Sequence, residues 1–134
     1  MPTTMYGPAK QALAEAKIDW ENDTWRVYLI DADEYTPDFD ADEFLDDVPG
    51  EALVAYEELT GMTNVLGVLD ADNPIFTAPS GAECENLLIV QWGTEAADSR
   101  LFLWLDDVGG MPITPGGTDI GVTWDDGANK ITAI

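Results

Sequence analysis

The spacing of apolar and polar residues changes once along the chain, just after residue 20. Before that point, small apolar residues recur at the spacing of a helix: Ala9, Ala12, Leu13 and Ala16. Pro8 precedes them and suits the first turn of a helix, where its missing N–H removes no hydrogen bond. The pattern predicts a short helix over 8–17 after an irregular arm over 1–7. Such a short, alanine-rich helix is marginal alone, so it must pack on its own domain or on a neighbouring subunit.

From Asp23 onward the spacing is that of β-strands, beginning with a run over 25–30 that is rich in aromatic and β-branched residues. Further strand candidates are separated by turn residues and lie at 51–58, 63–69, 74–78, 86–92, 100–106, 119–124 and 130–134. The clearest turn is Asp125-Asp126-Gly127, which predicts that the last two candidates form a hairpin. The nearly continuous apolar runs 87–90 and 101–105 predict central strands covered on both faces.

These elements predict a mainly β protein, specifically a two-sheet antiparallel β-sandwich of jelly-roll-like topology with a short N-terminal helix. We expect residues 1–22 to form the arm and helix, and residues 23–134 to form the sandwich domain. The acidic connection over 31–50 carries four apolar residues that a solvated loop does not need: Phe39, Phe44, Leu45 and Val48. We therefore expect this connection to be held against the domain.

The charge of the chain restricts its partners. There are 27 acidic residues against 5 basic ones, a formal net charge of -22, while 46% of residues are hydrophobic. Such a chain repels phosphate and anionic lipid, so we expect no nucleic-acid partner and no membrane surface. No apolar run approaches the roughly 20 residues of a membrane span, and we expect no signal peptide. A solvated surface, adaptation to high salt and a cationic partner all remain open.

The chain offers little chemistry for catalysis. It contains no histidine, which removes the commonest general base and metal ligand. The single cysteine, Cys84, lies between Glu83 and Glu85, whose negative charges disfavour a reactive thiolate. Acidic residues alone do not nominate a hydrolase pair. We therefore expect a protein that is not an enzyme and that needs no cofactor.

Two binding hypotheses depend on particular residues. Alternating carboxylates at Asp31 and Asp33, and again over 38–42, form either a solvated stripe or a weak divalent-cation site. An EF-hand loop beginning at Asp38 fails, because its sixth position is not glycine and its twelfth is not glutamate. The five tryptophans are typical of a strand core, with a carbohydrate-binding sandwich as the alternative. Trp20, just after the helix, is the tryptophan that no strand explains.

A set of short stretches runs nearly from end to end: Tyr6-Gly7, Ala9-Lys10-Gln11-Ala12-Leu13, Ile18-Asp19-Trp20, Asp23-Thr24 with Val27 and Leu29, Tyr35-Thr36-Pro37, Phe44-Leu45 with Pro49, Phe76-Thr77-Ala78, Ser99-Arg100, Pro112-Ile113-Thr114-Pro115, and Thr123-Trp124-Asp125 with Gly127-Ala128-Asn129-Lys130-Ile131. In these the chain resembles a family of small virion proteins of tailed bacteriophages. Pro8 and the high acidity depart from that family. The resemblance implies a decoration or minor capsid protein on the major capsid lattice, with a tail or head–tail connector component as the alternative. It implies a homo-oligomer on the capsid surface and supplies no catalytic residues.

The N-terminal segment is the predicted contact region for a neighbouring subunit or the capsid lattice. An irregular arm has little reason to carry apolar residues unless they are covered, and Lys10 and Lys17 are two of only five cations. The predicted contact residues are Met5, Tyr6, Lys10, Leu13 and Trp20. The alternative is a helix that packs on one end of its own sandwich.

Overall fold

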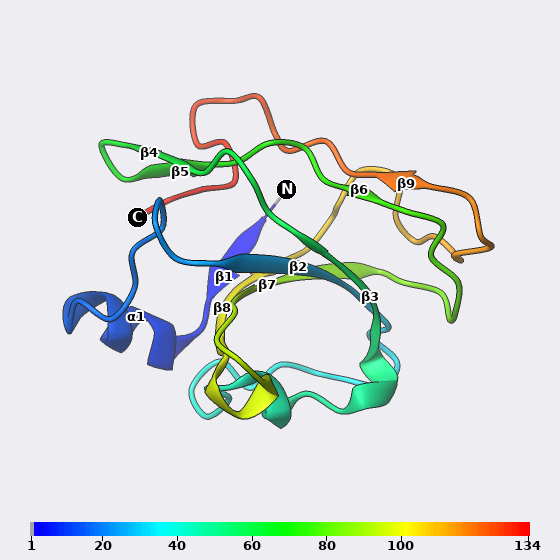
Figure 1. Ribbon diagram of the computed structural model, residues 1–134, viewed down its shortest axis with the longest axis horizontal. Helices are drawn as coiled ribbons and strands as arrows, with labels where there is room; N and C mark the ends of the chain where they lie inside the picture. Colours follow the sequence, from blue (N-terminus) through cyan, green and yellow to red (C-terminus); the bar gives the residue numbers. More distant parts are fainter. Residues whose placement is uncertain (1) are drawn as a thin grey trace.

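The computed structural model describes residues 2–134 and is mainly β, with antiparallel sheets and one short α-helix (Figure 1). Met1, the first residue of the predicted arm, lies outside the described residues. The elements in chain order are β1 (Thr3–Met5), α1 (Gly7–Ala14), β2 (Trp25–Ile30), the 3-10 turns η1 (Leu45–Asp47) and η2 (Gly50–Ala52), β3 (Leu53–Glu58), β4 (Thr63–Val65), β5 (Val68–Asp70), β6 (Ile75–Phe76), β7 (Asn86–Gln91), the 3-10 turn η3 (Ala96–Asp98), β8 (Arg100–Leu105), β9 (Ile120–Gly121) and β10 (Thr132–Ala133). Within residues 2–134, no helix is long and apolar enough to cross a bilayer.

A five-stranded antiparallel sheet of order β1-β8-β7-β2-β3 forms the middle of the molecule. Its central strands are the two continuous apolar runs, and all residues of 87–90 and 101–105 are buried. This confirms the prediction of central strands covered on both faces. The burial of these strands supplies much of the hydrophobic stabilisation.

One face of this sheet is covered by two smaller sheets, of order β10-β5-β4 and β6-β9 (Figure 1). The strands of the expected second sheet are therefore divided between a three-stranded and a two-stranded sheet. Leu69, Phe76, Trp124 and Ile131 from this layer are buried in the common core. Trp20 packs on Trp25, with ring centroids 4.8 Å apart.

The opposite face is covered by the acidic connection over 31–50, drawn in cyan below the sheet in Figure 1. Tyr35 meets Trp104 edge to face, with ring centroids 5.6 Å apart. Leu45 and Val48 are buried in the same cluster. The apolar residues therefore hold this connection on the domain, as the sequence predicts.

The predicted irregular arm is wrong for residues 3–5, because they form β1 and pair along β8. The predicted strand over 63–69 is instead the β4–β5 hairpin, whose turn places Leu66 and Gly67 at positive φ. The helix spans Gly7–Ala14, so it begins and ends earlier than the predicted 8–17. It ends early because Ala16 has a φ of 59° and Lys17 N–H donates to the Ala12 carbonyl at 2.9 Å. That arrangement closes a helix C-terminus.

The predicted hairpin between 119–124 and 130–134 is also wrong. Strand β9 pairs with β6, and β10 pairs with β5. The Asp125–Gly127 turn does form, since Gly127 N–H donates to Asp125 Oδ1 at 2.9 Å. The chain entering the turn is held elsewhere, because Trp124 Nε1 donates to the Asp72 carbonyl at 3.0 Å. A local turn signal therefore predicts the turn but not the partner of each flanking strand.

Candidate partner-binding site

Strand β1, helix α1 and strand β10 border a groove of about 370 Å³ at one end of the molecule. Its lining consists of Thr3, Met5, Lys10, Leu13, Thr132, Ala133 and Ile134. We call it the terminal groove; in Figure 1 it belongs to the left side, where α1 and the C-terminal strand lie. Three of the five predicted contact residues, Met5, Lys10 and Leu13, meet in this groove.

Local structure explains why these three side chains share one hollow. Strand β1 pairs along β8 and places Met5 at the outer edge of the main sheet. Helix α1 turns Ala9 and Ala12 into the core. Lys10 and Leu13 are three residues apart, so they are neighbours on the helix surface. Lys10 is exposed, while Met5 and Leu13 are half-buried.

Lys10 differs from the other two lysines in its surroundings. Lys17 pairs with Glu15 at 2.9 Å, and Lys130 pairs with Asp126 at 3.0 Å. Within residues 2–134, Lys10 has no carboxylate inside 4.0 Å. The terminal groove therefore carries an uncompensated positive charge on a strongly acidic protein.

Tyr6 and Trp20, the other two predicted contact residues, lie in the core of the chain itself. Tyr6 is 0% exposed and stacks edge to face on Phe39, with ring centroids 5.1 Å apart. Trp20 is 5% exposed and donates from Nε1 to the carbonyls of Thr63 and Asp70, at 2.9 and 3.1 Å. These two residues therefore pack on the chain's own domain, which is the alternative that the sequence left open.

Sequence reasoning missed the C-terminal side of the groove and the exposed hairpin next to it. Ile134 is 58% exposed, and its N–H donates to the Gly67 carbonyl at 2.8 Å. In the adjoining β4–β5 hairpin, Val65 is 65% exposed and Leu66 is 99% exposed. One signal in the sequence could have indicated this hairpin. Asn64 and Gly67 are turn-forming residues on either side of Val65 and Leu66, and they indicate a turn there rather than the middle of a strand. Exposed apolar groups are thus continuous from the groove to the hairpin tip.

A second hollow of about 310 Å³ adjoins the terminal groove and shares Leu13 and Ile134 with it. It extends inward past Ile18 to Trp20 and Phe102. A partly open, mainly apolar space therefore lies beside the C-terminal end of the helix. One acidic residue, Asp19, lies in this second lining.

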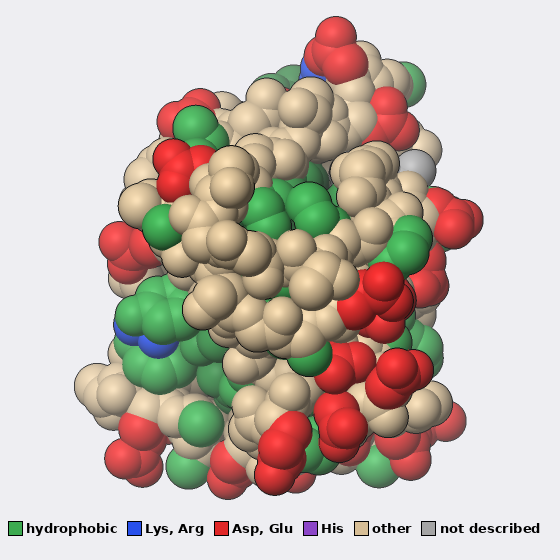
Figure 2. Space-filling view, turned by 90° about the vertical axis from the view of Figure 1, so that its right-hand side faces the viewer, with side chains coloured by type: hydrophobic (Ala, Val, Ile, Leu, Met, Phe, Trp, Pro, Cys, Tyr) green, Lys and Arg blue, Asp and Glu red, His purple; other side chains and the backbone are tan. Residues whose placement is uncertain are grey.

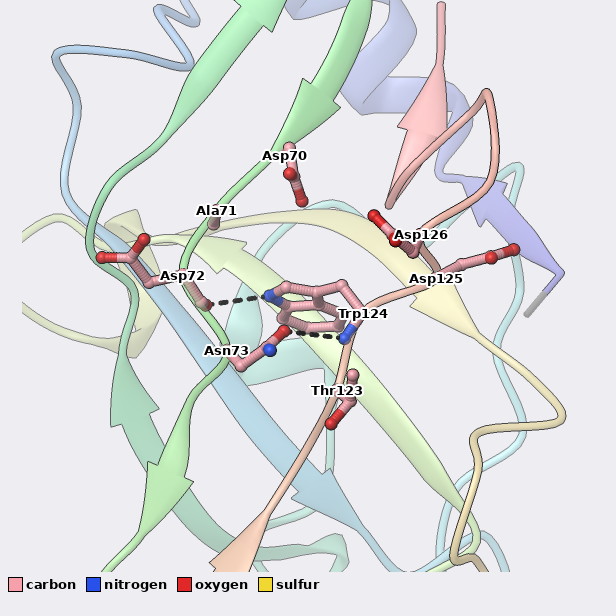
Figure 3. Close-up of a pocket in the computed structure, with 8 residues that line it drawn as sticks. All are labelled: Asp70, Ala71, Asp72, Asn73, Thr123, Trp124, Asp125 and Asp126. Atoms are coloured by element: carbon pink, nitrogen blue, oxygen red, sulfur yellow. Dashed lines mark hydrogen bonds between the residues drawn. The ribbon is translucent and has the colours of Figure 1, made fainter.

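Charge distinguishes the terminal groove from four other surface hollows of residues 2–134. Each of those four has at least one Asp or Glu side chain in its lining, and the terminal groove has none. The largest, of about 450 Å³, is bordered by Asp70, Asp72, Asp125 and Asp126 around the Trp124 indole (Figure 3). Figure 2 shows the end away from α1, where acidic side chains gather and basic ones are few. A hollow whose lining has no Asp or Glu side chain is therefore unusual on this surface.

No protein-family model matches the chain, and no curated protein matches it. The resemblance to bacteriophage virion proteins therefore stays a prediction from the residues that carry it.

The predicted cation ligands fall into two groups. Asp31 and Asp33 are joined by Glu85, which the sequence does not predict, and the three place carboxylate oxygens within 4.8 Å of one another. Burial is the main cause that raises the pKa of Glu85, and the neighbouring carboxylates add to it. The 38–42 carboxylates instead cap local turns, since Asp42 Oδ2 accepts from the Tyr35 hydroxyl and from Asp38 N–H.

Cys84 is fully buried. Burial first, and then the charges of Glu85, Asp31 and Glu83, raise the pKa of its thiol from 9.0 to about 12. The thiol is therefore protonated at neutral pH and is a poor nucleophile, in line with the reasoning from its acidic neighbours.

The carbohydrate hypothesis needs two aromatic rings at the surface with room for a sugar between them. Tyr56 and Trp92 form such a pair of rings, but an arginine side chain lies against both. The Arg26 guanidinium lies 3.5 Å from the Trp92 ring centroid and 4.1 Å from that of Tyr56. It occupies the space between the rings in which a sugar would stack. Trp92 also borders a polar hollow of about 380 Å³ together with Asp98 and Arg100.

Proposed function

We propose that this protein is a structural component of a tailed-bacteriophage virion, a capsid decoration or minor capsid protein that binds the major capsid lattice through the terminal groove. The observation that carries the proposal is the groove itself. It combines Met5, Leu13 and Ile134 with an unpaired lysine, and no Asp or Glu side chain lines it. On a chain of net charge -22, that combination suits contact with another protein.

The physical role follows from the groove and the charge. Burial of apolar surface contributes about 25 cal/mol per Å² to an interface, so the groove and the adjoining hairpin tip provide the attachment energy. A protein that binds only the assembled lattice stabilises that lattice by mass action. The acidic remainder of the surface faces solvent as a homo-oligomeric layer and keeps particles apart. No catalytic site or cofactor is needed for this role.

We also infer that the two small sheets act together as the second layer of a β-sandwich of jelly-roll-like topology. Both pack on the same face of the five-stranded sheet, which supports treating them as one layer. A rigid β body of this kind suits a particle surface, because it presents a fixed groove to every lattice site.

The copy number of the chain in purified virions tests the proposal. Hundreds of copies per particle, from quantified gel bands or mass spectrometry, are expected for a capsid decoration protein. A handful of copies would instead indicate a tail or connector component. Absence from purified virions would contradict any structural virion role.

A further inference from the structure

Strand β1 is an edge strand whose outward backbone groups lie at the terminal groove. Tyr6 N–H donates to the Phe102 carbonyl at 3.1 Å, and Asp106 N–H donates to the Pro2 carbonyl at 2.9 Å. Bonded residues alternate along an antiparallel pair, so Thr4 also bonds β8 and the main-chain groups of Met5 point away from it. None of the turn and loop hydrogen bonds of residues 2–134 reaches the Met5 N–H or C=O either.

Strand β10 offers a second edge to the same groove. It lies at the end of the order β10-β5-β4, and Ile134 N–H bonds the Gly67 carbonyl on β5. By the same alternation, the main-chain groups of Ala133 point outward. The two strands meet at one end, where the Thr3 hydroxyl donates to the Ile131 carbonyl at 2.9 Å. The groove therefore lies between two sheet edges that diverge from this contact.

The edge strands β3 and β4 are protected in ways that β1 is not. Strand β3 carries Glu57 and Glu58, and charged residues on an edge strand discourage pairing with another chain. Strand β4 is capped by its own chain, because Glu21 accepts from Asn64 N–H and Trp20 donates to the Thr63 carbonyl. Strand β1 has the sequence Thr-Thr-Met and carries no charge. On this acidic protein, β1 is an uncharged edge strand beside a groove without Asp or Glu side chains.

We propose that the terminal groove receives an extended segment of the partner protein, which adds to β1 as a further strand of the main sheet. The inference rests on the proposed virion function and specifies how the partner is held. Main-chain hydrogen bonds join the segment to Met5, as in other cases of strand addition. An apolar side chain of the segment packs between Leu13 and Ile134, and a carboxylate of the segment meets Lys10.

Charge complementarity favours a partner segment over a second copy of this chain. In a direct contact between two grooves, two copies that each carry a net charge of -22 repel one another, whereas in the proposed capsid layer each copy is held by the lattice. A groove facing its own copy would also offer neither Lys10 an Asp or Glu side chain, since none lines either groove. A partner segment that carries one acidic residue supplies the missing charge.

The test compares two substitutions of one residue in the full-length chain, using particles assembled without this protein as the probe. Met5→Pro removes the outward N–H, and proline is tolerated on an edge strand where the N–H faces away from the sheet. Met5→Leu keeps the N–H and the apolar side chain. We expect Met5→Pro to weaken binding to the particles about tenfold and Met5→Leu to change it less than threefold. Amide hydrogen exchange of Met5 in the wild-type chain should slow on binding.

The outcomes separate the binding mode from the proposed function. Suppose that the wild-type chain binds the particles. If Met5→Pro then binds as tightly as Met5→Leu, or if the exchange rate of the Met5 amide does not change on binding, strand addition is overturned and the virion role is left intact. Failure of the wild-type chain to bind the particles would contradict the virion role and this inference together. Self-association of the chain that depends on Met5 would show that a second copy is the occupant and would likewise overturn the inference. If Met5→Pro does not fold, the exchange measurement on the wild-type chain decides.

Discussion

The hydroxyl groups of Tyr6 and Tyr35 lie 3.0 Å apart, which ties the N-terminal segment to the acidic connection across the core. Tyr35 also donates to Asp42 Oδ2 at 2.7 Å. A phenol has a single proton to give, so Tyr6 donates to Tyr35 and Tyr35 donates to Asp42. This chain of hydrogen bonds explains why Tyr6 belongs to the body of the protein and not to its contact surface.

Substitution of Tyr35 by phenylalanine should destabilise the protein. The change removes the donor to a carboxylate and leaves the Tyr6 hydroxyl without its acceptor in a buried site. We expect a loss of about 2 kcal/mol in the free energy of unfolding, measured by denaturant titration. The matched control is Tyr56→Phe, because Tyr56 is 51% exposed and should change stability by less than about 0.5 kcal/mol. Equal effects of the two substitutions would show that the hydrogen-bond chain contributes nothing.

The same tyrosines predict a loss of stability in alkali. Burial raises the pKa of both Tyr6 and Tyr35 well above the usual 10.0. The unfolded chain therefore loses these protons before the folded chain does, and the stability that is present below pH 10 falls as the pH rises above it. The double variant Tyr6→Phe and Tyr35→Phe should show a smaller fall between about pH 9 and pH 11, a range that brackets the ordinary tyrosine pKa. An unchanged slope in thermal melts would contradict this assignment.

Cys84 should be unreactive in the folded protein. Its thiol is buried, and its pKa is raised to about 12. At pH 8 a disulfide reagent should modify it only after unfolding, because the thiolate is the reactive form. Labelling followed by mass spectrometry, with and without denaturant, measures this directly. Rapid labelling of the native chain would mean that the region around 82–86 opens readily.

Moderate salt should stabilise the isolated protein. A net charge of -22 on a chain of 134 residues repels itself, and added salt screens that repulsion. The melting temperature should therefore rise between low salt and about half-molar NaCl, where the screening length falls from tens of ångströms to a few. Potassium chloride should act equally if screening is the cause. A melting temperature that is unchanged or lower in salt would contradict the account of the charge.

The sequence predicts what depends on local pattern and misses what depends on long-range pairing. The apolar runs of β7 and β8 identify central strands because both faces of those strands are covered. The Asp125–Gly127 turn is visible in the sequence, but the pairing of β10 with β5 is not, since nothing near Thr132 indicates Leu69 as its partner.

The terminal groove shows the same limit. Met5, Lys10 and Leu13 could be proposed because they stand close together in an N-terminal segment that needs covering. Ile134 joins them only through the β1–β8 and β10–β5 pairings. The sequence places Trp20 on the contact surface because no strand explains it, and Tyr6 because an irregular arm has little reason to carry apolar residues. Distant segments of the chain cover both.

The central claim is that the chain attaches to virions through the terminal groove, and point substitutions test it better than a deletion. Removing residues 1–17 would also remove β1 and the buried Tyr6, so the sheet would lose an edge strand. Leu13→Asp places an acidic side chain in a groove that has none. Ile75→Asp adds the same charge at an apolar residue that is 57% exposed, lies on β6 and does not line the groove.

The deciding measurement is the affinity of each purified chain for particles assembled without it, by co-sedimentation, after thermal melts show that both variants are folded. The account predicts that Leu13→Asp weakens binding at least about tenfold, because a charge is then buried against apolar surface, and that Ile75→Asp stays within about twofold of the wild type. Binding of Leu13→Asp as tight as that of the wild type, or an equal loss in Ile75→Asp, would contradict it.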